Sequence, residues 1–180
     1  MRDEGRGMRD GGRGTIHPSS LIPHPVLIIA CGNPSRGDDA LGPILIERLS
    51  ASAEAIPGTD RSLDLMTDFQ LQIEHALDLK GRELVVFVDA ALSGPEPFSF
   101  SPVTPEPALS ITTHALSPGG LLRVFMAAVG GQLPDCRLLA IRGYGFELGS
   151  GLSAGAEANL TAAQGFLLDW LAGRRQSSSC

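Results

Sequence analysis

The chain has 180 residues, of which 43% are hydrophobic and 19% charged, and its formal net charge at pH 7 is −6. This length and balance are typical of one globular domain with a sizeable core. The acidic charge argues against nucleic acid as a partner. No stretch approaches the roughly 20 apolar residues of a membrane helix, so no membrane span is expected. The three cysteines are an odd number without CxxC spacing, which favours a reducing cytoplasm over a disulfide framework.

The two ends of the chain differ in composition from its body. Residues 1–24 contain MRDEGRG and its near-repeat MRDGGRG, which offer little apolar surface to bury. No apolar stretch directly follows the basic N-terminus, which excludes an ordinary secretory signal. We therefore expect a disordered leader over 1–24, one folded domain over 25–174 and a disordered tail over 175–180.

The first half of the body alternates predicted strands with predicted helices. Val26–Cys31 is a continuous apolar run, typical of a buried strand. After the loop GNPSRG, a helix is predicted to open at Asp38 and Asp39, with apolar residues at helical spacing. The positions expected on its buried face are Leu41, Ile44, Leu45 and Leu49. Residues 63–66 are a predicted short strand, and residues 70–79 a predicted helix that ends at Gly81.

The second half continues this alternation. Residues 84–88 carry the strongest central-strand signal and end at Asp89, and residues 98–103 are predicted as an edge strand because prolines flank them. Ser117 and Pro118 are a typical N-cap and first helical residue. The helix that they open is expected to bury Leu121, Leu122, Phe125, Ala128 and Val129. A strand over 137–141 and a last helix over 153–172 follow. That helix is expected to bury Leu160, Ala163, Leu167 and Trp170, and to stop at Gly173.

This order of elements predicts a three-layer αβα sandwich around a mostly parallel, twisted sheet of about five strands. In such sheets, ligands bind at the edge formed by the carboxyl ends of the strands. Four polar residues follow predicted strands or precede predicted helices and are expected at this edge: Asp38, Asp39, Asp89 and His114.

Two carboxylates and an imidazole that meet at one point suit a divalent ion such as nickel or zinc. Each residue also has a purely structural explanation. Asp38 is most simply a helix N-cap, and Asp39 could serve only the helix dipole. His114 could be an exposed loop histidine, whereas a carboxylate directly after a buried strand, as at Asp89, must be paired or functional. His75 is expected to be solvated.

Two other catalytic patterns do not fit the sequence. GNPSRG lacks the lysine and spacing of a phosphate loop, and no Cys–His nucleophile signature occurs. Cys31 lies beside the expected site, but a buried strand cysteine is usually an inert part of the core.

Several blocks of the sequence resemble those of the hydrogenase maturation proteases, and they occur in that family's order. VLIIACGNPSRGDDALGPILIERL resembles the family's strand, GN turn, acidic pair and helix glycine, the last at Gly42. FQLQIEHALDLKGRELVVFVDAA is similar to the second block, and THALSPGGLL to the histidine loop before a helix. The Leu152 and Ser153 pair resembles the region before the last helix.

The resemblance implies an aspartyl-type endopeptidase that removes the C-terminal extension of a nickel–iron hydrogenase large-subunit precursor after nickel insertion. The family's metal ligands, which are also its catalytic groups, fall on Asp39, Asp89 and His114. Nickel would arrive with the precursor, which is the implied partner, and no organic cofactor is implied.

Two other functions remain open on the residues alone. Peptidyl-tRNA hydrolases also place GNP after a first strand, but their following Arg-His-Asn segment is missing and a charge of −6 suits tRNA poorly. A non-catalytic nickel-binding chaperone on the same fold would need the same ligands, since ligands alone do not prove turnover.

Overall fold

The computed structural model describes residues 26–52, 63–107 and 116–177 of the chain. The expected leader over 1–24 and His114 lie outside the described residues, so the statements about them stay predictions. Five strands form one sheet in the order β2-β1-β3-β5-β4. The strands are β1 (Val26–Cys31), β2 (Leu63–Asp68), β3 (Leu84–Ala91), β4 (Phe98–Pro102) and β5 (Asp135–Arg142). All neighbours are parallel except β4, which pairs antiparallel with β5 at the edge.

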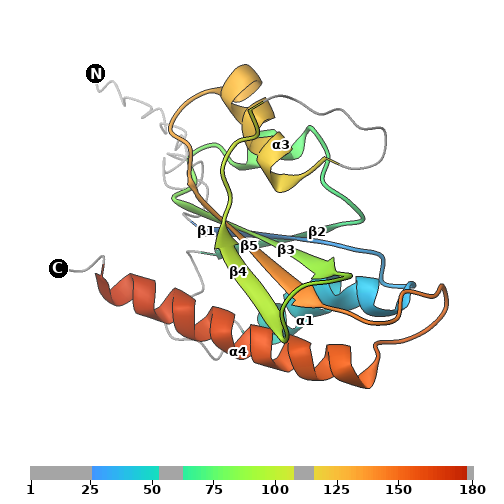
Figure 1. The fold of residues 1–180 in the computed structure, drawn as a ribbon. Helices are drawn as coiled ribbons and strands as arrows, with labels where there is room; N and C mark the ends of the chain where they lie inside the picture. The colour runs from blue at the N-terminus through green and yellow to red at the C-terminus, as the bar shows by residue number, and fades with distance from the viewer. Residues whose placement is uncertain (1–25, 53–62, 108–115, 178–180) are drawn as a thin grey trace, which may run out of the picture.

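Helices cover both faces of this sheet (Figure 1). One face packs against α1 (Leu41–Ser52) and α4 (Ala154–Ser177), and the other against α2 (His75–Asp78) and α3 (Pro118–Val124). The three-layer αβα sandwich with a mostly parallel five-stranded sheet, predicted from the sequence, is confirmed. None of the helices in the described ranges is both long and apolar enough to cross a bilayer.

The central strands divide their side chains between two cores. Ile28 and Val86 face α1 and α4, whereas Ile29 and Phe87 face α2 and α3. Because side chains alternate along a strand, a strand buried on both faces becomes a continuous apolar run, which is why β1 and β3 could be recognised in the sequence. Each such fully buried side chain contributes about 1.5–3 kcal/mol.

The helix predicted over 70–79 is shorter in the structure and spans only His75–Asp78. The Gln72 N–H donates to Nδ1 of His75 at 3.0 Å, and Nε2 of the same ring lies 3.3 Å from Oδ2 of Asp68. His75 is therefore buried and bound on both ring nitrogens, so the expectation that it is solvated was wrong. These bonds hold the chain before His75 in an irregular turn instead of a regular helix.

The helix that opens at Pro118 also departs from the prediction. It gives way to a π-helical turn, η4 (Phe125–Val129), in which the Gly130 N–H donates to the Phe125 carbonyl at 2.8 Å. Phe125 is buried as predicted, but the wider turn changes the register of the buried face. Ala128 is consequently exposed and Val129 only half-buried, contrary to prediction.

The last helix does not stop at Gly173 as predicted but continues to Ser177. Arg174 accounts for the difference, because it bonds to Asp135 at 2.8 Å and lies 5.0 Å from the ring centroid of Trp170. Trp170 is half-buried and packs edge-on against Phe100.

Candidate functional site

The site begins where β1 ends, beside the last residues of β3. Ala30 of β1 pairs with Val88 of β3, so Cys31 and Asp89 follow at the same level of the sheet. β2, the next strand along the chain, lies on one side of β1, and β3, the strand after that, lies on the opposite side of β1. The gap between β1 and β3 is therefore a topological switch point. In open α/β sheets, ligands bind in the crevice at such a point.

Two glycines bring the turn after β1 close to the helix that follows. Gly32 has φ +144°, and a Cβ there would lie 1.9 Å from the Asp39 carbonyl oxygen. A Cβ on Gly42 would lie 2.6 Å from the Cys31 carbonyl oxygen. The chain therefore folds back tightly through η2 (Gly37–Ala40), which places Asp39 beside Gly32, directly after β1.

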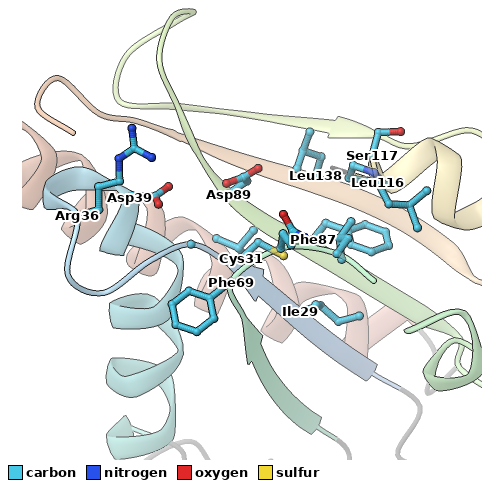
Figure 2. A pocket seen from close by; sticks show the side chains of 15 residues that line it. Ile29, Cys31, Arg36, Asp39, Phe69, Phe87, Asp89, Leu116, Ser117 and Leu138 are labelled. Carbon is cyan, nitrogen blue, oxygen red and sulfur yellow. The ribbon is translucent and has the colours of Figure 1, made fainter. Parts of the chain in front are cut away.

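Asp39 and Asp89 line the same opening (Figure 2). Oδ2 of Asp39 accepts from the Asn33 N–H at 3.0 Å, and Oδ1 of Asp89 accepts from the Ala90 N–H at 2.8 Å. Each carboxylate is thus oriented by a backbone amide at the end of its own strand or turn. Both residues border a cleft of about 570 Å³ and an adjoining pocket of about 290 Å³.

The surroundings raise the pKa of Asp89 to about 6. Desolvation by the cleft walls is the main cause, the Ala90 N–H opposes it, and the negative charge of Asp39 adds to the rise. Asp89 is solvent-exposed by surface area, yet the surrounding walls still favour its neutral form. A carboxyl group with such a pKa can exchange a proton near neutral pH, which is a common property of catalytic acids and bases.

Asp38 does not lie at this opening and does not cap its own helix. It is fully buried, and η2 shows no side-chain cap. Its Oδ2 accepts from the N–H groups of Tyr144 and Gly145 at 2.7 and 2.9 Å, and both its oxygens accept from Ser153. Burial by itself raises the pKa of Asp38, but these hydrogen bonds together hold it below its usual value. The predicted N-cap is therefore wrong.

The third predicted ligand, His114, lies outside the described residues. Leu116, two positions further along the chain, lines the cleft together with Ser117 and Pro118. Within the described part of the chain, no three His, Cys, Asp or Glu residues are grouped closely enough to hold a metal ion.

Cys31 lines the cleft as well (Figure 2). Burial, followed by the charges of Asp89, Asp68 and Asp39, raises the pKa of its thiol to about 12. The thiolate is the nucleophilic form of cysteine, so this thiol is unsuited to attack at neutral pH.

Arg36 and the apolar cleft walls were not anticipated from the sequence as parts of the site. Arg36 borders both the cleft and the smaller pocket, and its Nε donates to the Phe146 carbonyl at 3.0 Å. Ile29, Phe69, Leu71 and Phe87 are among the apolar residues that line the larger cleft. The position of Arg36 in the sequence could have indicated that it belongs to the site, since it lies in the turn between a buried strand and the acidic pair.

Several solved structures share this fold. The nickel–iron hydrogenase maturation protease HycI from Thermococcus kodakarensis KOD1 is 22% identical, with a TM-score of 0.61 over 80% of this chain and 90% of the other. The hydrogenase maturating endopeptidase HybD from E. coli is 22% identical, with a TM-score of 0.59 over 84% and 93%. The hydrogenase 2 maturation peptidase from Thaumarchaeota archaeon SCGC_AB-539-E09 is 24% identical, with a TM-score of 0.55 over 81% and 97%.

These similarities come from the structure rather than from the sequence. No protein-family model matches the chain, and no curated protein matches it in sequence. At identities between 22 and 24%, what is shared is the arrangement of the backbone over nearly the whole length of each relative. The chain thus has the fold of the nickel–iron hydrogenase maturation proteases.

Proposed function

We propose that this chain is an endopeptidase that removes the C-terminal extension of a nickel–iron hydrogenase large-subunit precursor after nickel insertion. The observation that carries the proposal is the pair Asp39 and Asp89, which borders one cleft at the switch point of the sheet. Known proteins support the proposal through the fold that this chain shares with hydrogenase maturation proteases.

The nickel of the precursor is part of the substrate in this proposal. Asp39, Asp89 and His114 are the proposed ligands, because oxygen and imidazole donors suit this borderline ion. For His114 the support is indirect, since Leu116 lines the cleft. A nickel ion held there polarises a nearby carbonyl or water, so cleavage needs no protein nucleophile. This fits the raised thiol pKa of Cys31.

The cleft has the size and lining for a peptide segment. Its volume of about 570 Å³ lies within the range of small-molecule sites, and most of its walls are apolar. A chain terminus laid across the two carboxylates would bury its side chains against these walls. The reaction is expected in the cytoplasm, where Cys31 and Cys136, both free and buried, stay reduced.

Incubation of the purified chain with nickel-loaded and nickel-free precursor tests the proposal. Mass spectrometry should detect loss of a C-terminal peptide from the loaded precursor only. Asp39→Asn, Asp89→Asn and His114→Ala should each abolish the cleavage, whereas Asp169→Asn, at an exposed position on α4, should not change it. Nickel-dependent binding without cleavage would instead identify a chaperone, and cleavage of both precursors would contradict the role of nickel.

A further inference from the structure

Arg36 is held rigidly at the rim of the candidate site. Its backbone N–H donates to the Asn33 carbonyl at 3.0 Å, and its own carbonyl accepts from the Asp39 N–H at 3.1 Å. Its Nε donates to the Phe146 carbonyl at 3.0 Å. Main chain and side chain are thus both fixed, which reduces the conformational entropy that a long arginine side chain loses on binding a ligand.

The two terminal nitrogens of this guanidinium have no hydrogen bond or ion pair with any residue in the described ranges, although Asp39 and Asp89 border the same pocket. Figure 2 shows Arg36 beside Asp39, on the side away from Asp89. The arginine therefore does not serve as the ion-pair partner of the two carboxylates, and its donors can bind a ligand.

The smaller pocket contains few groups that can recognise a peptide. It is lined by Arg36, Asp39, Asp89, Ala90, Leu92 and Phe146. Among these described residues, only Arg36 has a side chain with permanent N–H donors. A peptide that enters the pocket presents carbonyl oxygens, which need donors when they lose water.

The carboxylates lie between this pocket and the larger apolar cleft, since both residues border both spaces. A peptide bond placed over the carboxylates would therefore have one flank in the larger cleft and the other in the pocket of Arg36. An anionic group of a ligand in that pocket would be repelled by the carboxylates of Asp39 and Asp89, whereas a neutral carbonyl oxygen would not be repelled.

We propose that Arg36 is a substrate-binding residue that holds a main-chain carbonyl oxygen of the precursor beside the scissile bond. This inference rests on the proposed function, because it takes a peptide as the ligand. The hydrogen bond from Arg36 to the precursor forms in the ground state as well as in the transition state. Its loss should therefore weaken binding of the precursor more than it slows the chemical step.

The test compares Arg36→Gln, Arg36→Lys and the unmodified chain with the nickel-loaded precursor. Arg36→Gln should raise KM, and the dissociation constant measured by biolayer interferometry, about tenfold with kcat changed less than about twofold. Arg36→Lys keeps the charge without the planar fork and should be intermediate. Arg123→Gln, at an exposed position on α3, should match the unmodified chain. Thermal melts should differ little among the variants, because Arg36 is exposed and its replacement removes only one hydrogen bond at the surface.

The outcomes separate this inference from the proposed function. Tight binding and processing that do not change in a folded Arg36→Gln variant overturn the role of Arg36 alone, as does a fall in kcat with unchanged KM. Binding without cleavage overturns the endopeptidase function, and the dissociation constants of the variants still decide whether Arg36 holds the precursor. A chain that neither binds nor cleaves the precursor overturns both.

Discussion

Asp38 and Asp39 are adjacent in the sequence, but their carboxylates bind different parts of the chain. Asp39 borders the cleft and accepts a hydrogen bond from the Asn33 N–H. Asp38 is fully buried and binds a segment more than a hundred residues away, through Tyr144, Gly145 and Ser153. Ser153 in turn caps α4, since its Oγ accepts from the Ala156 N–H at 3.2 Å. One acidic pair thus joins the candidate site to the start of the last helix.

Asp38→Asn is expected to lower the free energy of unfolding by about 3 kcal/mol, because it removes a buried charged acceptor. The asparagine amide would also present a donor to backbone N–H groups that need an acceptor. Urea unfolding measures the loss, with Asp169→Asn, an exposed carboxylate on α4, as the matched control. A loss of 1 kcal/mol or less, about that of an ordinary N-cap, would contradict this account of Asp38.

Asp89→Asn is expected to stabilise the chain at pH 8. The pKa of Asp89 is about 6 in the folded chain against an ordinary value of 3.8. Between these values the folded state binds more protons than the unfolded state, so stability falls as the pH rises through this window. Asparagine is neutral throughout and avoids that loss. Thermal melts should show the advantage shrinking as the pH falls from 8 to 4, and an advantage that does not depend on pH would contradict it.

The strands and helices that could be predicted from the sequence are those whose apolar side chains form the two cores. β1 and β3 are apolar on both faces, and the apolar faces of α1 and α4 have helical spacing. The error over Ala128 and Val129 lies where the helix widens into a π-helical turn, and the other errors lie where a side chain binds outside its own helix pattern. His75 bonds to Asp68 and to a nearby amide, and Arg174 bonds to Asp135. Such contacts leave no periodic pattern in the sequence.

The same distinction applies to the site. Asp39 and Asp89 could be placed at one edge because the carboxyl ends of neighbouring parallel strands meet there. Asp38 fits the pattern of an N-cap, and nothing nearby in the sequence indicates that Tyr144 donates to it. Arg36 looks like any solvated loop arginine until the Phe146 carbonyl and the two cavities are seen around it.

Gly42→Ala is expected to destabilise the chain by about 1–3 kcal/mol, as overpacking usually does. The added methyl group would lie 2.6 Å from the Cys31 carbonyl oxygen, so α1 would have to move away from the end of β1. Gly165→Ala is the matched control, because nothing lies within 4 Å of the added carbon on α4. That variant should gain up to about 1 kcal/mol from helix propensity. Equal changes in the two variants in urea unfolding would contradict the close packing at Gly42.

Cys31→Ala is expected to process the precursor, since the thiol, with its pKa near 12, is protonated at neutral pH. Loss of the buried sulfur should cost about 1 kcal/mol of stability through a small cavity. Cys136→Ala is the control, being equally free and buried but not among the residues that line the described cleft. A folded Cys31→Ala variant without activity, beside an active Cys136→Ala variant, would point to thiol chemistry.

The titration of Asp89 gives a test that does not depend on activity. Carbon-13 NMR of the side-chain carboxyl groups should show Asp89 titrating with a midpoint of about 6. In Asp39→Asn the midpoint should move down, because one cause of the raised pKa, the negative charge of Asp39, is gone. Desolvation remains, so the midpoint should stay above 3.8. A separate measurement uses activity: precursor processing by the unmodified chain should fall as the pH drops below about 6, because a protonated carboxyl is a poor metal ligand. Asp89 titrating at the same pH in both proteins would show that the charge of Asp39 does not act on it, and titration at its ordinary value would show that the cleft walls do not desolvate it.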